Sequence, residues 1–199
     1  MVTNPYGTAT SVSATLSVIN VPSGTYAAAA MQPDLALYYR LNDADTGLNV
    51  ATNQGSLGFA YDGTYEGGYT SVAGPAGFSN FEANNEAVSL DGFTADVKLP
   101  SPSGTLSEAT MAAWVYKQVE QVGDAAIFFH RSTDTFGLSV YPNTETGADT
   151  LRYTWKGTHY TFASGLVLPT NQWAFVAASV TPDAAVLYLF DGRSLKSAT

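Results

Sequence analysis

The chain has 199 residues, of which 45% are hydrophobic and 13% aromatic, so it can bury a core of ordinary domain size. Its net charge is −9, with 8 Lys and Arg against 17 Asp and Glu, which excludes the basic surface that nucleic-acid binding needs. Cys is absent, which excludes disulfides and thiolate metal sites. The sequence contains no run of 18 apolar residues, so no membrane-spanning segment is predicted.

The first twenty residues predict a turn followed by one strand. Residues 4–7 (Asn-Pro-Tyr-Gly) are typical of a turn, and residues 14–19 alternate small or polar side chains with apolar ones. One strand cannot bury its own face, so this segment is not predicted to be a domain by itself. Residues 21–34 are predicted to be a linker that contains one short helical turn, at 26–31, which Pro33 ends.

From residue 35 onward the pattern is that of short β-strands joined by turns. The expected strands are 35–41, 57–65, 87–90, 93–99, 110–117, 125–130, 136–141, 151–155, 159–163, 173–180 and 185–190. Many short strands separated by turn residues predict an all-β sandwich or barrel.

Two hairpins are expected among these strands. The Asp-Gly pair at 91–92 supplies the positive φ angles of a tight turn between 87–90 and 93–99. In the second of these strands one face, predicted to be buried, holds Phe93, Ala95, Val97 and Leu99. The other hairpin joins the last two strands across residues 181–184.

Four segments, in chain order, resemble the motifs of laminin-G-like domains. The first is Tyr38-Tyr39-Arg40-Leu41-Asn42-Asp43, with Tyr39 where the family has Trp, and the second runs from Val88-Ser89-Leu90-Asp91-Gly92 through Val97-Lys98-Leu99-Pro100. The third is Thr110-Met111-Ala112-Ala113-Trp114-Val115. The fourth runs from Asn171-Gln172-Trp173-Ala174-Phe175-Val176-Ala177 through Ala185-Val186-Leu187-Tyr188-Leu189-Phe190-Asp191-Gly192, with Phe190 as an extra residue before the Asp-Gly pair. The chain is therefore similar to the concanavalin-A-like/laminin-G modules of bacterial surface or secreted proteins. That resemblance implies a jelly-roll sandwich of two antiparallel sheets, with Trp114 and Trp173 in its core.

The resemblance also implies boundaries. Residues 4–18 are similar to the final hairpin of an immunoglobulin-like domain, so 1–20 is expected to be the C-terminal strand of such a domain, 21–34 a linker and 35–199 the laminin-G-like sandwich. In the family, further strands follow the last Asp-Gly turn, so the sandwich is expected to be incomplete at its C-terminal end. The implied location is secreted or at the bacterial cell surface, with the signal peptide outside this chain.

No catalytic constellation is found in the sequence. Related hydrolases on this fold carry Glu-x-Asp-x-x-Glu on one strand, and none of the Glu residues here is followed two positions later by Asp. Residues 130–134 hold the residue types of a catalytic triad, but their spacing is too local, and a turn at a strand end is the better interpretation. Two isolated histidines, His130 and His159, do not make a zinc site.

A calcium site is one hypothesis for the loops. Asp43, Asp45 and Asp62 offer the hard oxygen ligands that calcium prefers, and calcium is the one cofactor that the sequence suggests. The alternative is that these carboxylates cap backbone groups in turns, as Asp often does.

A carbohydrate site is the other hypothesis. Tyr153 and Trp155 lie two apart on one strand face, and His159 and Tyr160 follow across a turn, so their rings could pack against the C–H face of a sugar. The alternative is that these are ordinary core side chains.

These observations predict a non-catalytic binding or adhesion module of an exported or cell-surface protein. Its partner would be a glycan or an extracellular or surface protein. Two alternatives stay open. The domain could be a purely structural spacer, or it could be a glycoside hydrolase or lyase built on the same sandwich.

Overall fold

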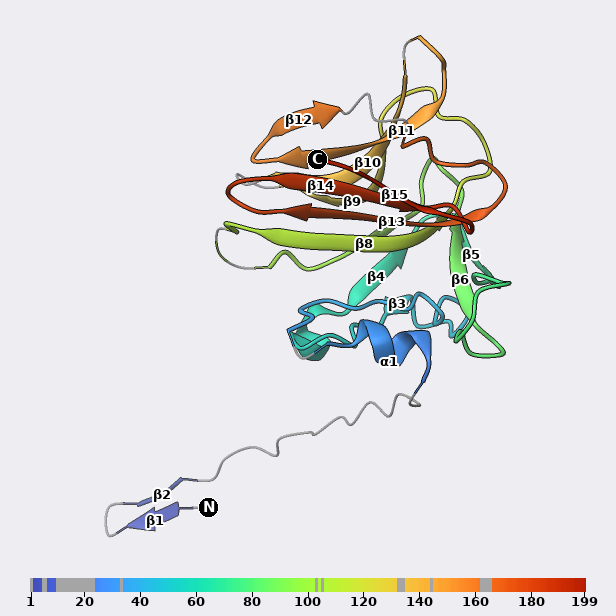
Figure 1. The fold of residues 1–199 in the computed structure, drawn as a ribbon. Helices are drawn as coiled ribbons and strands as arrows, with labels where there is room; N and C mark the ends of the chain where they lie inside the picture. The colour runs from blue at the N-terminus through green and yellow to red at the C-terminus, as the bar shows by residue number, and fades with distance from the viewer. Residues whose placement is uncertain are drawn as a thin grey trace.

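The regular secondary structure of the molecule is almost entirely β-strand, as predicted (Figure 1). The computed structural model describes residues 2–4, 7–9, 24–32, 34–102, 104, 106–131, 135–143, 145–161 and 166–199. In chain order the elements are β1 (Val2–Asn4), β2 (Gly7–Ala9), α1 (Tyr26–Ala30), β3 (Val50–Ala51), a 3-10 helix (Gly58–Tyr61), β4 (Gly63–Glu66), β5 (Tyr69–Ala73), β6 (Glu86–Leu90), β7 (Asp96–Lys98), β8 (Ala109–Tyr116), β9 (Ala125–His130), β10 (Phe136–Pro142), β11 (Asp149–Trp155), β12 (Thr158–Thr161), β13 (Trp173–Val180), β14 (Ala185–Phe190) and β15 (Leu195–Ala198).

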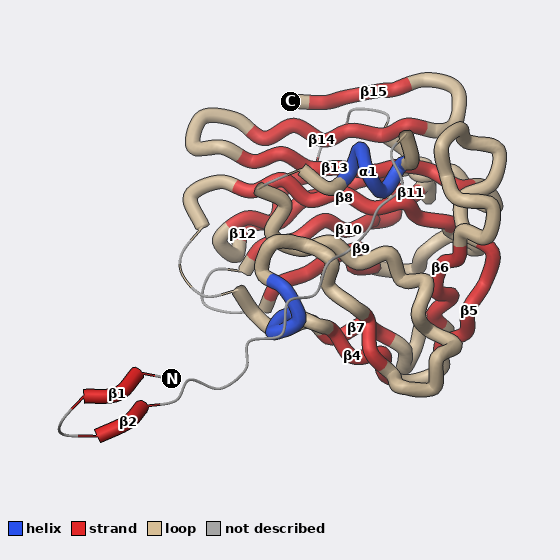
Figure 2. Tube along the Cα trace, turned by 90° about the horizontal axis from the view of Figure 1, so that it is seen from below, coloured by secondary structure: helices blue, strands red, loops and turns tan. Residues whose placement is uncertain are grey.

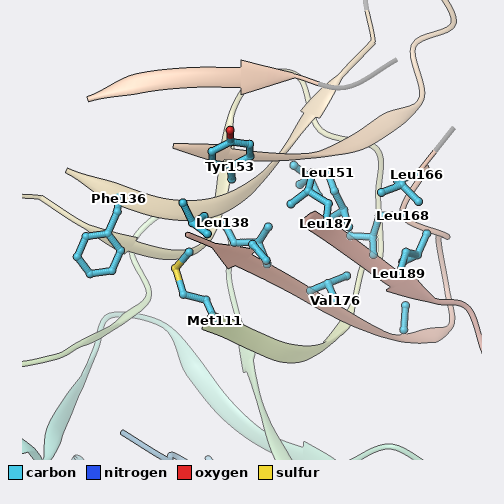
Figure 3. Close-up of a cluster of buried hydrophobic side chains, with 14 residues drawn as sticks. Met111, Phe136, Leu138, Leu151, Tyr153, Leu166, Leu168, Val176, Leu187 and Leu189 are labelled. Carbon is cyan, nitrogen blue, oxygen red and sulfur yellow. The ribbon is translucent and has the colours of Figure 1, made fainter. Parts of the chain in front are cut away.

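Two antiparallel sheets of four strands form the sandwich. One has the strand order β12-β11-β10-β9 and the other has the order β15-β14-β13-β8. The side chains that fill the space between them come from both sheets and from the segment before β13 (Figure 3). They include Met111, Phe136, Leu138, Val140, Leu151, Tyr153, Leu166, Leu168, Val176, Leu187 and Leu189. Burial of this apolar surface is the main force that holds the two sheets together.

Strand alternation explains why one face of each strand enters this core. Along β13 the alanines and valines at 174, 176, 178 and 180 are buried in the core, while Trp173 and Phe175 point to the opposite face. The predicted strands 125–130, 173–180 and 185–190 are confirmed with the same bounds, and the last hairpin pairs β13 with β14 as expected.

The outer face of the β15-β14-β13-β8 sheet is covered by an aromatic cluster. Seen from below, α1 lies over β8 and β13 (Figure 2). The ring of Trp114 on β8 packs against rings from the same sheet and from residues 26–81, which are Tyr26, Phe78, Phe81, Phe175 and Phe190, with centroid distances of 4.5 to 6.4 Å. The expectation that Trp114 and Trp173 lie in the core between the sheets is therefore wrong. Trp114 packs on the outer side of its sheet, and Trp173 packs against Tyr116 on that same side.

The short helix α1 begins where the sequence predicts. The Thr25 hydroxyl accepts a hydrogen bond of 3.2 Å from the backbone N–H of Ala28, which caps the first turn. The helix holds Tyr26 against Phe81, with ring centroids 4.6 Å apart. None of the helices among the described residues is long or apolar enough to cross a membrane.

The predicted strand at 35–41 is wrong. Only an isolated bridge between Tyr39 and Asn53 forms there, and Leu41 adopts a positive φ of 56°, which breaks an extended strand. The backbone of this segment instead hydrogen-bonds to the loop at 54–57. The predicted strand 57–65 is partly wrong, because the 3-10 helix occupies its first half and only β4 is extended.

The predicted hairpin around residues 91–92 is also wrong. Strand β6 pairs with β5 and strand β7 pairs with β4, so the two segments belong to different sheets. The Asp91 carboxylate accepts hydrogen bonds from the backbone N–H groups of residues 93–95 and holds a wider turn. Phe93, predicted to be buried, is 95% exposed at this turn.

Strands β3, β4 and β7 form a small sheet with a core of its own, beneath the sandwich in Figure 1. Its buried residues are Ala44, Ala51 and Tyr65, and Val97 packs against them. The sequence did not predict β3, β5 or the edge strand β15, which pairs with β14. At the N-terminal end β1 and β2 pair around the predicted turn, whereas the predicted strand 14–19 lies outside the described residues.

Candidate functional site

The outer face of the β12-β11-β10-β9 sheet carries polar and charged side chains, of which Ser139 and Thr154 are buried and Arg131 is exposed. Its core-facing residues alternate with outward ones, so the outward set follows from the register: Ala126 and Phe129 on β9, Gly137, Ser139 and Tyr141 on β10, and Arg152 and Thr154 on β11. We call this set, with Asp124 and Arg131 at the two ends of β9, the Arg152 face.

At one end of the Arg152 face an arginine contacts a carboxylate and an aromatic ring. The Arg152 guanidinium donates to the Asp124 carboxylate and lies 4.6 Å from the centre of the Tyr141 ring. Its side chain is only 13% exposed. Arg152 Nε and the hydroxyl of its register partner Ser139 are buried and have no hydrogen-bond partner among the described residues. Within the described ranges, these two donors on neighbouring strands have no acceptor.

At the other end a second arginine rests on a ring. The Phe129 ring lies against the backbone of Gly137, where an added Cβ would stand 2.5 Å from a Phe129 ring carbon. The guanidinium carbon of Arg131 lies 5.3 Å from the centre of that ring. This cation–π contact fixes the guanidinium plane and leaves its N–H edges to the surroundings.

A pocket of about 400 Å³ lies between these two ends. Its lining comes from β9, from the start of β10 and from the β11–β12 turn, and consists of Asp124, Ala126, Phe129, Arg131, Thr135 and Gly157. The pocket thus offers a guanidinium, an aromatic edge and a carboxylate that is already paired. These groups converge on one hollow of the surface and could contact a polar ligand there.

Comparison with known proteins assigns the fold to a family. The family model of the concanavalin A-like lectin/glucanases superfamily matches residues 90–199, which is more than half of the chain. This chain belongs to that superfamily. No curated protein and no solved structure matches it. The matched residues supply both four-stranded sheets and every residue of the Arg152 face.

Within this superfamily sandwich the predicted sugar-binding residues lie on or beside β11. Tyr153 is 7% exposed and points into the core (Figure 3), and Trp155 packs against the same core. Tyr153 therefore cannot offer its ring face to a ligand from outside. The backbones of His159 and Tyr160 pair with Thr154 and Tyr153, but their side chains lie outside the described part of the chain.

The predicted calcium ligands serve the loops next to β3. Asp43 accepts from the backbone N–H of Thr52 at 2.7 Å and from the Tyr65 hydroxyl at 2.5 Å. Burial, together with Asp43, raises the pKa of Tyr65. Asp62 accepts from the N–H of Asn53 at 2.8 Å, and Asp45 is exposed. Across the described ranges no group of three or more His, Cys, Asp or Glu side chains is arranged to hold a metal ion.

A charged cluster closes one end of the superfamily sandwich. Lys117, after β8, forms ion pairs with Asp149 at 2.8 Å and with Glu120 at 2.7 Å. Lys117 and the Thr170 hydroxyl lower the pKa of Glu120 to about 2. Each carboxylate is already bound to protein donors, so this cluster is structural.

The Arg152 face was not predicted from the sequence, although part of its signal is present there. Residues 150, 152 and 154 are polar and alternate with the apolar residues 151, 153 and 155, so β11 has one polar face. The prediction followed the aromatic side of this strand rather than the polar side. The contribution of β9 has no such signal, because a bulge interrupts its alternation.

Proposed function

We propose that this chain is a non-catalytic binding module of an exported or cell-surface protein, and that it binds a glycan on the Arg152 face. The observation that carries the proposal is the pocket of about 400 Å³ on this face, which is lined by Arg131, Phe129 and Asp124, with Asp124 paired to Arg152. Membership of a superfamily that is named for lectins and glucanases is compatible with a sugar ligand. A surface protein that presents a glycan would be bound in the same way.

The carboxylate in the pocket argues for binding rather than hydrolysis. A retaining glycosidase needs two carboxyl groups about 5–5.5 Å apart, and an inverting enzyme needs a wider pair. Among the described residues that line the pocket, Asp124 is the carboxylate, and Arg152 neutralises it. With one carboxylate among these lining residues, the pocket lacks the pair of carboxyl groups that either mechanism requires.

A structural spacer is the second candidate, and the aromatic cluster around Trp114 favours it. Tyr26, in the segment that leads into the sandwich, is stacked on Phe81 and packs edge-on against Trp114. The chain that enters the domain is thereby fixed to it, as a rigid spacer requires. The spacer needs no pocket, so ligand binding distinguishes the two candidates.

The experiment is a glycan-array screen followed by calorimetry on the 199-residue chain, with calcium and with EDTA. The blocking variant is Ala126→Trp, which places an indole in the pocket from an exposed position. The matched control is Ala112→Trp, also exposed, on the outer face of the other sheet. We expect glycan binding that A126W abolishes and A112W retains. Absence of binding to every glycan and surface protein tested would favour the spacer.

A further inference from the structure

The Arg131 end of the pocket is a stack of three residues, each of which positions the next. Gly137 lets the Phe129 ring lie against the sheet, since a Cβ there would stand 2.5 Å from a ring carbon and 2.5 Å from the carbonyl oxygen of residue 128. The ring then supports the Arg131 guanidinium at 5.3 Å. A guanidinium held on a ring loses less freedom when it binds a ligand, which raises affinity.

The described residues around the pocket carry more positive than negative charges. Asp124 is neutralised by Arg152, whereas none of the ion pairs formed by the described residues involves Arg131. Lys156, next to the lining residue Gly157, adds another exposed cation at the β11–β12 turn. Among the described residues around the pocket, cations therefore outnumber carboxylates, on a chain whose net charge is −9. An anionic group is the complementary partner of such a site.

We propose that the ligand of this pocket is an acidic glycan whose carboxylate or sulfate group binds to Arg131. This inference rests on the proposed function and names the chemical class of its ligand. The N–H edge of the guanidinium pairs with two oxygens of the anion, a geometry that Lys cannot reproduce. Phe129 and Gly137 are positioning residues, because they act on the anion through Arg131.

The negative net charge of the chain affects how strongly a polyanion is attracted to this pocket. At low ionic strength a polyanion is repelled by the acidic protein as a whole and attracted only by the pocket. Salt weakens both the repulsion by the whole protein and the attraction by the pocket. The affinity should therefore depend on salt far less than it does for proteins that bind polyanions through a broad basic surface. The discrimination between acidic and neutral sugars should then arise from Arg131 itself.

The test is calorimetry on the full chain with three hexasaccharides: an oligogalacturonate, a heparin-derived oligosaccharide and neutral cellohexaose. For at least one acidic sugar we expect tighter binding than for the neutral one. Arg131→Gln should weaken it about tenfold or more, because one charge-assisted contact is lost. Arg131→Lys should restore part of that loss. The control Arg193→Gln removes an exposed arginine at the β14–β15 turn and should change nothing.

The positioning residues give a second measurement. Gly137→Ala should lift the Phe129 ring and weaken the acidic sugar in the same direction as R131Q, with a smaller effect on any neutral sugar. Inorganic sulfate alone, added as a competitor at the concentration of the glycan, should not displace it. Full displacement would mean that the pocket takes a free anion, and would overturn the inference.

The results separate this inference from the proposed function. If glycans bind, A126W abolishes binding and R131Q has no effect, the Arg152 face is a glycan site and the acidic-ligand inference is wrong. The same holds if cellohexaose binds as tightly as both acidic sugars. If no glycan binds at all, both proposals fail together. Circular dichroism of each variant shows that a loss of binding is not a loss of fold.

Discussion

Lys117 and Asp149 form an ion pair with 2.8 Å between Nζ and Oδ2, although their side chains are only 4% and 0% exposed. The pair joins the residue that follows β8 in one sheet to the first residue of β11 in the other. The backbone N–H of Gln121 also donates to Asp149, at 3.0 Å. The two sheets are therefore held together by one charged contact in addition to their apolar core.

Removal of one partner of this pair should be costly. Lys117→Met leaves Asp149 as a buried charge with too few donors, and we expect the free energy of unfolding to fall by about 3–5 kcal/mol. The double variant Lys117→Met/Asp149→Leu should recover much of that loss, because it removes the uncompensated charge. Urea denaturation of the three proteins measures the effect. A loss below about 1 kcal/mol for K117M would contradict the buried geometry.

Glu120 should make the stability of the domain depend on pH. Its pKa is lowered from 4.5 to about 2 by Lys117 and Thr170. A carboxylate with a lowered folded-state pKa stabilises the fold above its ordinary pKa, and that contribution is lost as the pH falls toward 2. The difference in urea midpoint between the natural chain and Glu120→Gln should therefore shrink between pH 5 and pH 2. Half of the Glu120 side chain is exposed, so solvent keeps the effect small.

The aromatic cover over Trp114 should be detectable in solution. Tyr26→Ala removes the ring that packs on Phe81 and Trp114, and we expect a loss of about 1–3 kcal/mol and a red shift of tryptophan fluorescence. The control is Phe59→Ala, at a position 79% exposed, which should change stability by less than about 0.5 kcal/mol. An unchanged melting temperature in Y26A would mean that residues 24–31 do not pack on the sheet.

The turn at residues 91–95 gives a paired test of side-chain placement. Phe93→Ser should leave stability within about 0.5 kcal/mol, because this ring is 95% exposed. Val97→Ala should cost about 1 kcal/mol, because Val97 packs against the buried residues Ala44, Ala51 and Tyr65. Thermal melting of both variants measures the two losses of stability. A larger loss for F93S than for V97A would support the hairpin that the sequence alone predicted.

Strands with a continuous two-residue pattern were predictable, and loops that bond through side chains were not. Residues 173–180 and 185–190 alternate cleanly and are joined by a turn, so both strands and their pairing were found. The Asp-Gly pair at 91–92 looked like a hairpin turn, but the Asp91 carboxylate captures three backbone N–H groups and redirects the chain. Nothing in the local pattern distinguishes these two uses of Asp.

The candidate site was harder to predict than the fold, for a geometric reason. The sequence identified the right strand, β11, but a strand has two faces, and which one meets the core is settled by the partner sheet. Tyr153 faces inward and Arg152 outward. The predicted sugar-binding residues were chosen because they are aromatic, and the aromatic residues of β11 lie on its core-facing side. The pairing of Arg152 with Asp124, 28 positions earlier, follows only from the register of β9.

That register contains one irregularity, between Leu138 and Ser139, where β9 carries the extra residue Ile127. In a regular strand the residues two and four positions after Ala126 would share its face, so Phe128 and His130 would line the pocket. The bulge instead turns Phe129 and Arg131 outward. The chemistry of the pocket therefore depends on the number of residues in β9 as well as on their identities. In evolutionary terms, a single codon gained after the bulge would turn both side chains toward the core and erase the site without substituting any residue.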